Sequence, residues 1–210
     1  PILCNGVKEE SFMAFLRIFT NSAKELKSVR CIVTIGVLLA AAVVLDGFGS
    51  IRIGDYLKIN FAFLPLAMTG ILFGPVAGCA AGLLTDLVGY LVNPIGGFIP
   101  ELMLITGLEG LIYGLVLYNI KSERTYRTFI RVVAARFIVC AVCNLTLNTL
   151  ALYNYGFISG ASFGAVFTAR VATNIITFCL GSYMMMAVVI PVKLFYDRHL
   201  RFSRTRPAHR

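Results

Sequence analysis

The chain has 210 residues, of which 58% are hydrophobic and only 14% charged, with a net charge of +9 and a mean hydropathy of +0.83. This composition leaves too little polar surface to cover a soluble globule and indicates an integral membrane protein. Apolar runs such as residues 59–85, 27 residues without Asp, Glu, Lys or Arg, can cross the ~30 Å hydrocarbon layer as helices and lack the alternation of a transmembrane barrel.

Residues 1–30 are expected to form a cytoplasmic segment before the first span. The stretch "FMAFLRIF" predicts either a short amphipathic helix on the membrane surface or a solvated lead-in. The segment lacks the apolar core and small-residue cleavage site of a signal peptide.

Six helical spans are predicted within a single bundle over residues 31–192, which makes the fold class an all-α membrane protein. The spans lie near residues 31–46, 59–74, 76–92, 101–119, 130–152 and 165–192. Loops at 47–58, 93–100 and 153–164 join them on one side, and the breakers in "NPIGGFIP" mark the middle one. The second and third spans are short for a full crossing.

The basic residues are concentrated between the spans. Lys and Arg number five in residues 1–30, four in 121–131 and six in the basic tail 193–210, which is 15 of the 19 in the chain. Positive charge marks cytoplasmic segments, so both termini are expected inside and the number of spans is even. The same distribution argues against a nucleic-acid partner, which would need a continuous basic surface.

Small residues recur at intervals of four. Gly70, Gly74, Gly78 and Gly82 form one such series, and Gly110 and Gly114 repeat the spacing. This pattern lets membrane helices approach closely, so it predicts a compact bundle. Gly36 and Ala40 in the first span share the spacing, and either pack internally or form a groove for a partner's helix.

No motif for catalysis, a metal or a cofactor is recognisable. The chain contains no GxxxxGK[ST], HExxH or GxSxG sequence, so we expect neither an enzyme nor an ATPase. Cys140 and Cys143 form a "CAVC" within an apolar span and are interpreted as packing residues. Both histidines, His199 and His209, lie in the basic tail.

Arg170 is the most unusual polar residue, because 33 uncharged residues precede it and 22 follow it. It either extends outward to the headgroups or faces a cavity, where its planar fork can bind a carboxylate or a heteroaromatic edge. Asn174 lies one helical turn deeper on the same face, and Asn148 lies near the outer end of the fifth span. Arg136, about six residues into the fifth span, is predicted to extend to the cytoplasmic headgroups.

Aromatic and acidic residues complete the candidates. Phe61 and Phe98, at the outer side, are either lipid or core contacts or a pair that stacks on a flat ligand ring. Asp86, Glu101 and Glu109 suggest the alternative of a proton path in a small secondary transporter, although no inverted repeat is visible.

Two blocks of sequence resemble a known family. The first block, residues 54–118, contains the motifs "LKINFAFLP", "LFGP", "DLVGYL", "FIP" and "GLIYGL". The second block consists of "LNTLAL" (147–152) and "ARVATN" (169–174). Together they cover roughly half the chain. They resemble the substrate-binding S components of energy-coupling factor (ECF) vitamin transporters, the folate family in particular.

The resemblance implies a six-helix protein of the bacterial cell membrane that captures a vitamin from outside. It then docks on a transmembrane coupling protein that carries two ATPases, and it needs no cofactor. Arg170 and Asn174 would be ligand contacts, with Asn148, Phe61 and Phe98 as weaker candidates, and Gly36 and Ala40 would form the docking surface.

The sequence also departs from the family pattern. Glu101 and Glu109 stand where a small or hydroxyl residue is expected, and Gly47 stands near an expected outer-loop arginine, for which Arg52 is a candidate substitute. The ligand is therefore expected to be folate, a related heterocycle or another vitamin.

Overall fold

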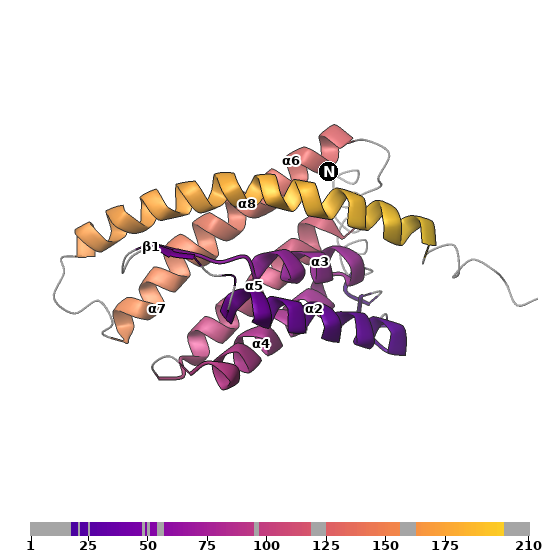
Figure 1. Ribbon diagram of the computed structural model, residues 1–210, viewed down its shortest axis with the longest axis horizontal. Coiled ribbons are helices and arrows are strands. Elements are labelled where there is room, and N and C mark those ends of the chain that lie inside the picture. Colours follow the sequence, from indigo (N-terminus) through magenta and orange to yellow (C-terminus); the bar gives the residue numbers. More distant parts are fainter. Residues whose placement is uncertain are drawn as a thin grey trace, which may run out of the picture.

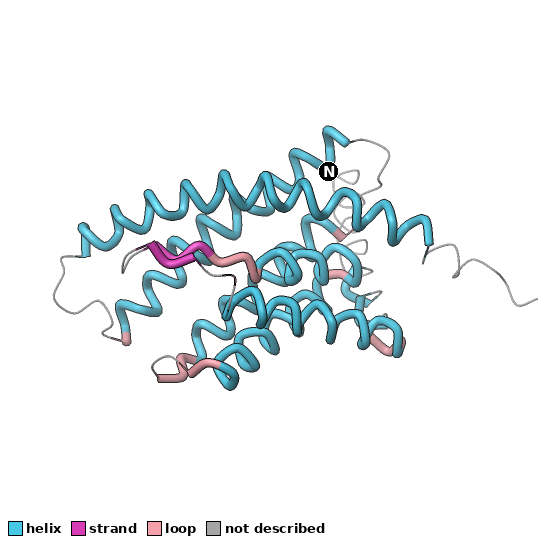
Figure 2. Tube along the Cα trace, viewed as in Figure 1, coloured by secondary structure: helices cyan, strands magenta, loops and turns pink. Residues whose placement is uncertain are grey.

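The protein is almost entirely helical (Figures 1 and 2). The computed structural model describes residues 18–20, 22–24, 26–47, 49, 51–53, 57–94, 97–118, 125–155 and 163–199. Its helices are α2 (Val29–Gly47), α3 (Phe63–Phe73), α4 (Pro75–Val92), α5 (Pro100–Leu117), α6 (Thr125–Ile138), the π-helix η1 (Val139–Leu147), α7 (Asn148–Asn154) and α8 (Phe163–His199). Two short strands, β1 (Ile51–Ile53) and β2 (Leu57–Ile59), form an antiparallel pair.

The predicted class, a bundle of membrane helices, is confirmed. Five helical stretches of the described chain are long and apolar enough to cross a membrane, and α3 is apolar but has only 11 residues. The fifth predicted span is one continuous helix built from α6, η1 and α7. In Figure 1 this composite helix runs beside α8, while α2 to α5 pack together on its other side. The termini lie outside the described residues, so their cytoplasmic placement stays a prediction.

The predicted loop at 47–58 contains a structured element that we did not expect. Arg52 pairs with Lys58 and Ile53 with Leu57 across the β1–β2 hairpin. The sequence "IRIGDYLKI" alternates apolar and polar residues on both sides of its centre, which is the period of a strand. The second helix consequently begins at Phe63 instead of near residue 59.

The glycine series packs helices together as predicted. Gly78 on α4 and Gly110 on α5 lie so close that a Cβ on either residue would overlap the other's carbonyl group. A Cβ on Gly70 of α3 would lie 2.8 Å from the backbone nitrogen of Gly114. Contacts this close are available only to glycine, and they hold α3, α4 and α5 in a compact group.

A buried serine fixes the turn between α3 and α4. Gly74 has a φ of +91°, which glycine adopts without steric strain. The hydroxyl of Ser22 donates to the carbonyl of Phe73 at 2.7 Å and accepts the N–H groups of Val76 and Ala77 at 3.2 and 3.4 Å. Ser22 therefore caps the start of α4 from a segment more than 50 residues away in sequence.

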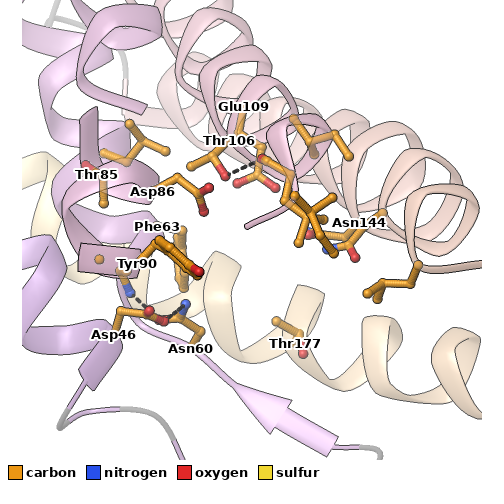
Figure 3. A pocket seen from close by; sticks show the side chains of 18 of the residues that line it. Asp46, Asn60, Phe63, Thr85, Asp86, Tyr90, Thr106, Glu109, Asn144 and Thr177 are labelled. Atoms are coloured by element: carbon orange, nitrogen blue, oxygen red, sulfur yellow. Dashed lines mark hydrogen bonds between the residues drawn. The ribbon is translucent and has the colours of Figure 1, made fainter. Parts of the chain in front are cut away.

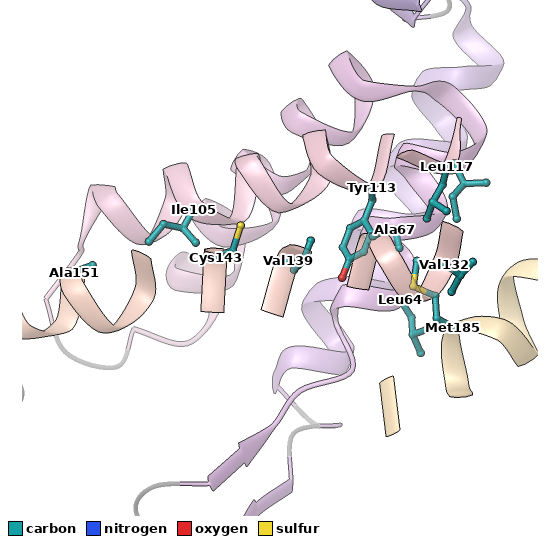
Figure 4. Close-up of a cluster of buried hydrophobic side chains, with 12 residues drawn as sticks. Leu64, Ala67, Ile105, Tyr113, Leu117, Val132, Val139, Cys143, Ala151 and Met185 are labelled. Carbon is teal, nitrogen blue, oxygen red and sulfur yellow. The ribbon is translucent and has the colours of Figure 1, made fainter. Parts of the chain in front are cut away.

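The largest hydrophobic cluster lies along the interface of α5 with α6 and η1, and α3 and α8 close it (Figure 4). Its members include Tyr113, Leu117, Val139 and Met185, each with no exposed surface. Cys140 and Cys143 are buried free thiols, so the interpretation of "CAVC" as packing residues is confirmed. This cluster extends along the composite helix from Val132 to Ala151 and fixes that helix against α5.

Candidate functional site

A cavity of about 770 Å³ lies between α3, α4, α5, α8 and the composite helix, and it extends to residues 97–99. We call the end of the bundle that holds these residues and the hairpin the outer end, because the charge distribution predicts that it faces outside. The polar side chains lining the cavity are Asp46, Asn60, Thr85, Asp86, Tyr90, Asn93, Thr106, Glu109, Arg136, Asn144, Asn148, Arg170, Thr173, Asn174 and Thr177.

Arg170 faces this cavity from the outer part of α8. Its Nη1 donates a hydrogen bond to the hydroxyl of Thr149 on α7 at 3.2 Å, and the side chain is half-buried. One helical turn deeper, the side-chain amide of Asn174 donates to the backbone carbonyl of Arg170 at 2.9 Å. Arg170 keeps further N–H donors, and Asn174 keeps its amide oxygen and a second N–H, that can turn toward a bound molecule.

The other predicted site residues are placed differently. Asn148 and Phe98 line the cavity, and the Phe98 ring lies 5.2 Å from the ring of Tyr90 in a tilted pair. Phe61 lies in the turn before α3 and is not among the described residues of the cavity wall, whereas Phe63 is. The backbone of Arg52 lies in β1, and its side chain lies outside the described residues.

The prediction that Arg136 extends to the headgroups is wrong. Its helix begins at Thr125 instead of near residue 130, so Arg136 lies 11 residues into the helix and is only 2% exposed. Its Nη1 donates to the hydroxyl of Tyr113 at 2.8 Å, and its guanidinium carbon lies 3.7 Å from the centre of the Phe63 ring. A hydrogen bond and a cation–π contact thus offset part of the cost of burying this charge.

A glycine on α8 makes room for this arginine. A Cβ on Gly181 would lie 2.8 Å from both Nε and Nη2 of Arg136. Among the described residues, Nε of Arg136 has no hydrogen-bond partner. The inner end of the cavity therefore holds a buried guanidinium whose donors are not all used within the protein.

Two carboxylates reach the same region. Asp86 on α4 and Glu109 on α5 point into the cavity between Thr106 and Phe63 (Figure 3). Glu109 interacts electrostatically with both Arg136 and Asp86. Glu101, the third acidic candidate, is exposed at the start of α5 and does not line the cavity. The inner part of the cavity is therefore charged, a property that we had not predicted.

A third carboxylate has a different role. The side chain of Asn60 donates to Asp46 at 2.6 Å, and its own oxygen accepts the backbone N–H of Ala62 at 2.8 Å. These bonds tie the end of α2 to the start of α3 at the edge of the cavity.

The π-helix brings the polar residues of the composite helix to one side. In an ideal α-helix, Asn144 would lie about 80° around the axis from Arg136. The i→i+5 winding of η1 turns the chain less per residue, so that both residues line the cavity together with Asn148. Single π-helical turns inside α-helices are frequently found at functional sites.

The arrangement suits the binding of a small molecule. Within the residues that the structure describes, no group of three or more His, Cys, Asp or Glu side chains could hold a metal ion. A concave site of this volume with convergent polar groups is typical of small-molecule binding.

Comparison with known proteins identifies the family. A family model described as "ECF-type riboflavin transporter, S component" matches residues 26–193. The chain belongs to this family. It is therefore an S component, a multi-pass protein of the bacterial cell membrane that serves in transport.

Individual relatives of this S component are named for folate instead of riboflavin. A folate transporter FolT from Clostridium novyi (strain NT) is 29% identical over 153 residues, which cover 73% of this chain and 84% of that protein. A crystal structure of FolT bound with folic acid is also 29% identical, with a TM-score of 0.65 over 75% of this chain and 91% of that chain. The structure of an S component of a bacterial ECF transporter, 20% identical with a TM-score of 0.54 over 80% of this chain and 98% of that one, supports the fold alone.

Proposed function

We propose that this S component binds folate or a related heterocycle with high affinity and takes it from outside. The observation that carries the proposal is the cavity of about 770 Å³, which holds one arginine at its outer end and a second at its inner end. Small-molecule sites have volumes of roughly 300–1,000 Å³, and the wall of this cavity is unusually rich in polar side chains that can bind polar ligand groups. The folate-binding relatives at 29% identity support the same ligand class.

Each predicted contact has a chemical role in this proposal. Arg170 binds an anionic group through its fork, and Asn174 and Asn148 donate or accept hydrogen bonds beside it. Phe98, already paired with Tyr90, stacks on a ring near the outer end. Ligand contacts by Phe61 and Arg52 stay predictions, because neither residue is among those described in the cavity wall.

The proposal includes docking on a coupling protein with two ATPases. Gly36 and Ala40 are exposed on α2, and a Cβ on Gly36 would meet nothing within 4 Å. Small residues on an exposed membrane helix allow a partner's helix to approach closely. The chain contains no phosphate-binding loop of its own, which is consistent with energy supplied by a partner.

Two alternatives remain and are open to experiment. In the first alternative the ligand is another vitamin, such as the riboflavin for which the family model is named. Alternatively, Asp86 and Glu109 carry protons in a secondary transporter, since both line the cavity, whereas Glu101 is exposed outside it.

The test is to purify the full chain in mild detergent and identify co-purifying small molecules by mass spectrometry. The apo protein is then titrated with folic acid and with riboflavin by calorimetry. Recovery and tight binding of a folate support the proposal, and binding of riboflavin alone overturns its ligand. Substrate uptake into liposomes by the isolated chain, driven by a proton gradient, would establish the secondary-transporter alternative instead.

A further inference from the structure

Phe63 is the first residue of α3 and lines the inner part of the cavity (Figure 3). Helix α3 has only 11 residues, so it rises about 16 Å from the turn at Gly74, on the predicted cytoplasmic side. That length is about half of the ~30 Å hydrocarbon layer. The short helix therefore places the ring of Phe63 near the middle of the membrane, in the wall of the cavity.

One face of the Phe63 ring is covered from behind. The guanidinium carbon of Arg136 lies 3.7 Å from the ring centre, which is a cation–π contact. Arg136 is itself held by its hydrogen bond to Tyr113 and by the space that Gly181 leaves beside it. Phe63 nevertheless stays partly exposed, so the surface of the ring that Arg136 leaves open contributes to the cavity wall.

The ring of Phe63 is not used by another aromatic residue. Three aromatic side chains belong to the described cavity wall, and two of them, Tyr90 and Phe98, pair with each other toward the outer end. Within the part of the chain that the structure describes, Phe63 makes no ring contact with a second aromatic side chain, and its one charged neighbour is Arg136. Its open surface is therefore available to a ligand.

Aliphatic side chains continue this surface. Leu66 follows Phe63 by three residues on α3, and Leu102 and Ile105 have the same spacing on α5, so each pair shares one face of its helix. All four residues line the cavity, whose remaining wall is mainly polar. The site thus contains an apolar patch between α3 and α5 with a single aromatic ring.

We infer that Phe63 is the aromatic contact for the planar ring of the ligand, and that Arg136 is a positioning residue that holds Phe63 from its other side. The inference rests on the proposed function and adds a residue to its predicted contacts. A flat heteroaromatic ring buries apolar area against phenylalanine and packs on it in an offset-stacked or edge-to-face arrangement. Arg136 needs no contact with the ligand for this role, because it acts through Phe63.

The test measures two ligands on the full chain in detergent by calorimetry. Phe63→Leu keeps an apolar side chain but removes the ring, and it should weaken the binding of folic acid at least about fivefold. Tetrahydrofolic acid, whose pyrazine ring is saturated and no longer planar, keeps the other groups of folic acid and should lose less affinity. Phe63→Tyr keeps an aromatic ring and should bind folic acid within about threefold of the wild type.

Two further variants separate the roles of Phe63 and Arg136. Phe137→Leu, at a side chain on α6 that is 62% exposed, is the matched control and should bind both compounds like the wild type. Gly181→Ala is not in the described cavity wall, but it displaces the guanidinium behind Phe63. It should also weaken folic acid more than tetrahydrofolic acid, and wild-type binding of both compounds would overturn the positioning role of Arg136.

The outcomes distinguish this inference from the proposed function. If the wild type binds folic acid tightly and Phe63→Leu binds it equally well, or loses the same factor for both compounds, the inference fails and the proposed function stands. If the wild type does not bind folic acid, the proposed function itself fails. An experimental structure of the wild-type complex decides without a substitution: the pterin ring should lie against Phe63, and a ring elsewhere in the cavity overturns the inference.

Discussion

Gly181 on α8 and Arg136 on α6 fit against each other within the bundle, since a Cβ on Gly181 would lie 2.8 Å from two nitrogens of the guanidinium. The sequence around either residue does not predict this contact, because the two residues are 45 positions apart on different helices. The glycine leaves the volume in which a buried charge is held against Tyr113 and Phe63.

Replacing this glycine should therefore displace the arginine. Gly181→Ala is expected to lower the free energy of unfolding by about 1–3 kcal/mol, the usual cost of overpacking, despite the higher helix propensity of alanine. Thermal unfolding in detergent measures the change. Gly36→Ala is the control, since a Cβ there meets nothing within 4 Å; equal stability of the two variants would contradict the packing argument.

Arg170→Ala should weaken folic acid binding at least tenfold while the protein still folds. The substitution removes the charged hydrogen bonds between Arg170 and the ligand, which are worth about 1.5–3 kcal/mol. Thr149, the partner of Arg170 within the protein, carries no charge and cannot replace them. Titration calorimetry gives the affinity, and thermal unfolding checks the fold. Arg131→Ala, an exposed arginine on α6, should bind like the wild type; an unchanged affinity of the Arg170 variant would remove Arg170 from the site.

The contact between α4 and α5 predicts a large loss of stability for Gly78→Ala. Its Cβ would lie 2.9 Å from the carbonyl carbon of Gly110, and backbone cannot rotate away as a side chain can. We expect a loss of about 3 kcal/mol or failure to accumulate in the membrane. Gly89→Ala, on the same helix with open space around it, should gain up to about 1 kcal/mol. Similar unfolding temperatures for the two variants would show that the helices can separate at little cost.

The cap formed by Ser22 should contribute to stability from outside the spans. Ser22→Ala removes the acceptor of the Val76 and Ala77 N–H groups and should cost about 1 kcal/mol. Thr34→Ala is a matched control, because its hydroxyl bonds only within α2, to the carbonyl of Arg30. Thermal unfolding of both variants distinguishes a cap from a general effect of losing a hydroxyl.

The docking surface proposed on α2 predicts a separation of binding from transport. The double variant Gly36→Leu and Ala40→Leu should bind folic acid normally but lose ATP-driven uptake in proteoliposomes that contain the coupling protein and ATPases. The exposed Ala134 on α6 provides a small-to-large control, Ala134→Leu, which should transport normally. Uptake by the double variant at the wild-type rate would place docking elsewhere.

The sequence was sufficient for the helical architecture because its signals are strong and local. Continuous apolar runs bounded by Gly and Pro predicted membrane helices, and the four-residue glycine spacing predicted close packing that the structure confirms at Gly78 and Gly110. The hairpin was missed because its alternation covers only three residues on each strand.

The charged inner end of the cavity was missed for a different reason. The depth of Arg136 depends on where its helix begins, and α6 begins at Thr125, five residues before the predicted start, which places Arg136 in the interior and not near the headgroups. Its partners, Tyr113 and Phe63, come from other helices, so no periodicity in its own segment indicates them. Arg170 was recognisable in the sequence because no other charged residue lies near it. Its hydrogen-bond partner Thr149 lies on another helix, so the sequence around Arg170 does not indicate it.

The π-helical stretch Val139–Leu147 lets this span hold one more residue than an α-helix would between the same two contact points. Deleting a single residue there would let the chain rewind as an α-helix and continue to cross the bundle. Asn148 would then follow Arg136 by 11 residues, which is about 20° from three full turns, so both would still face the cavity. Evolution could therefore gain or lose a residue inside this span while the side chains at its two ends keep their contacts.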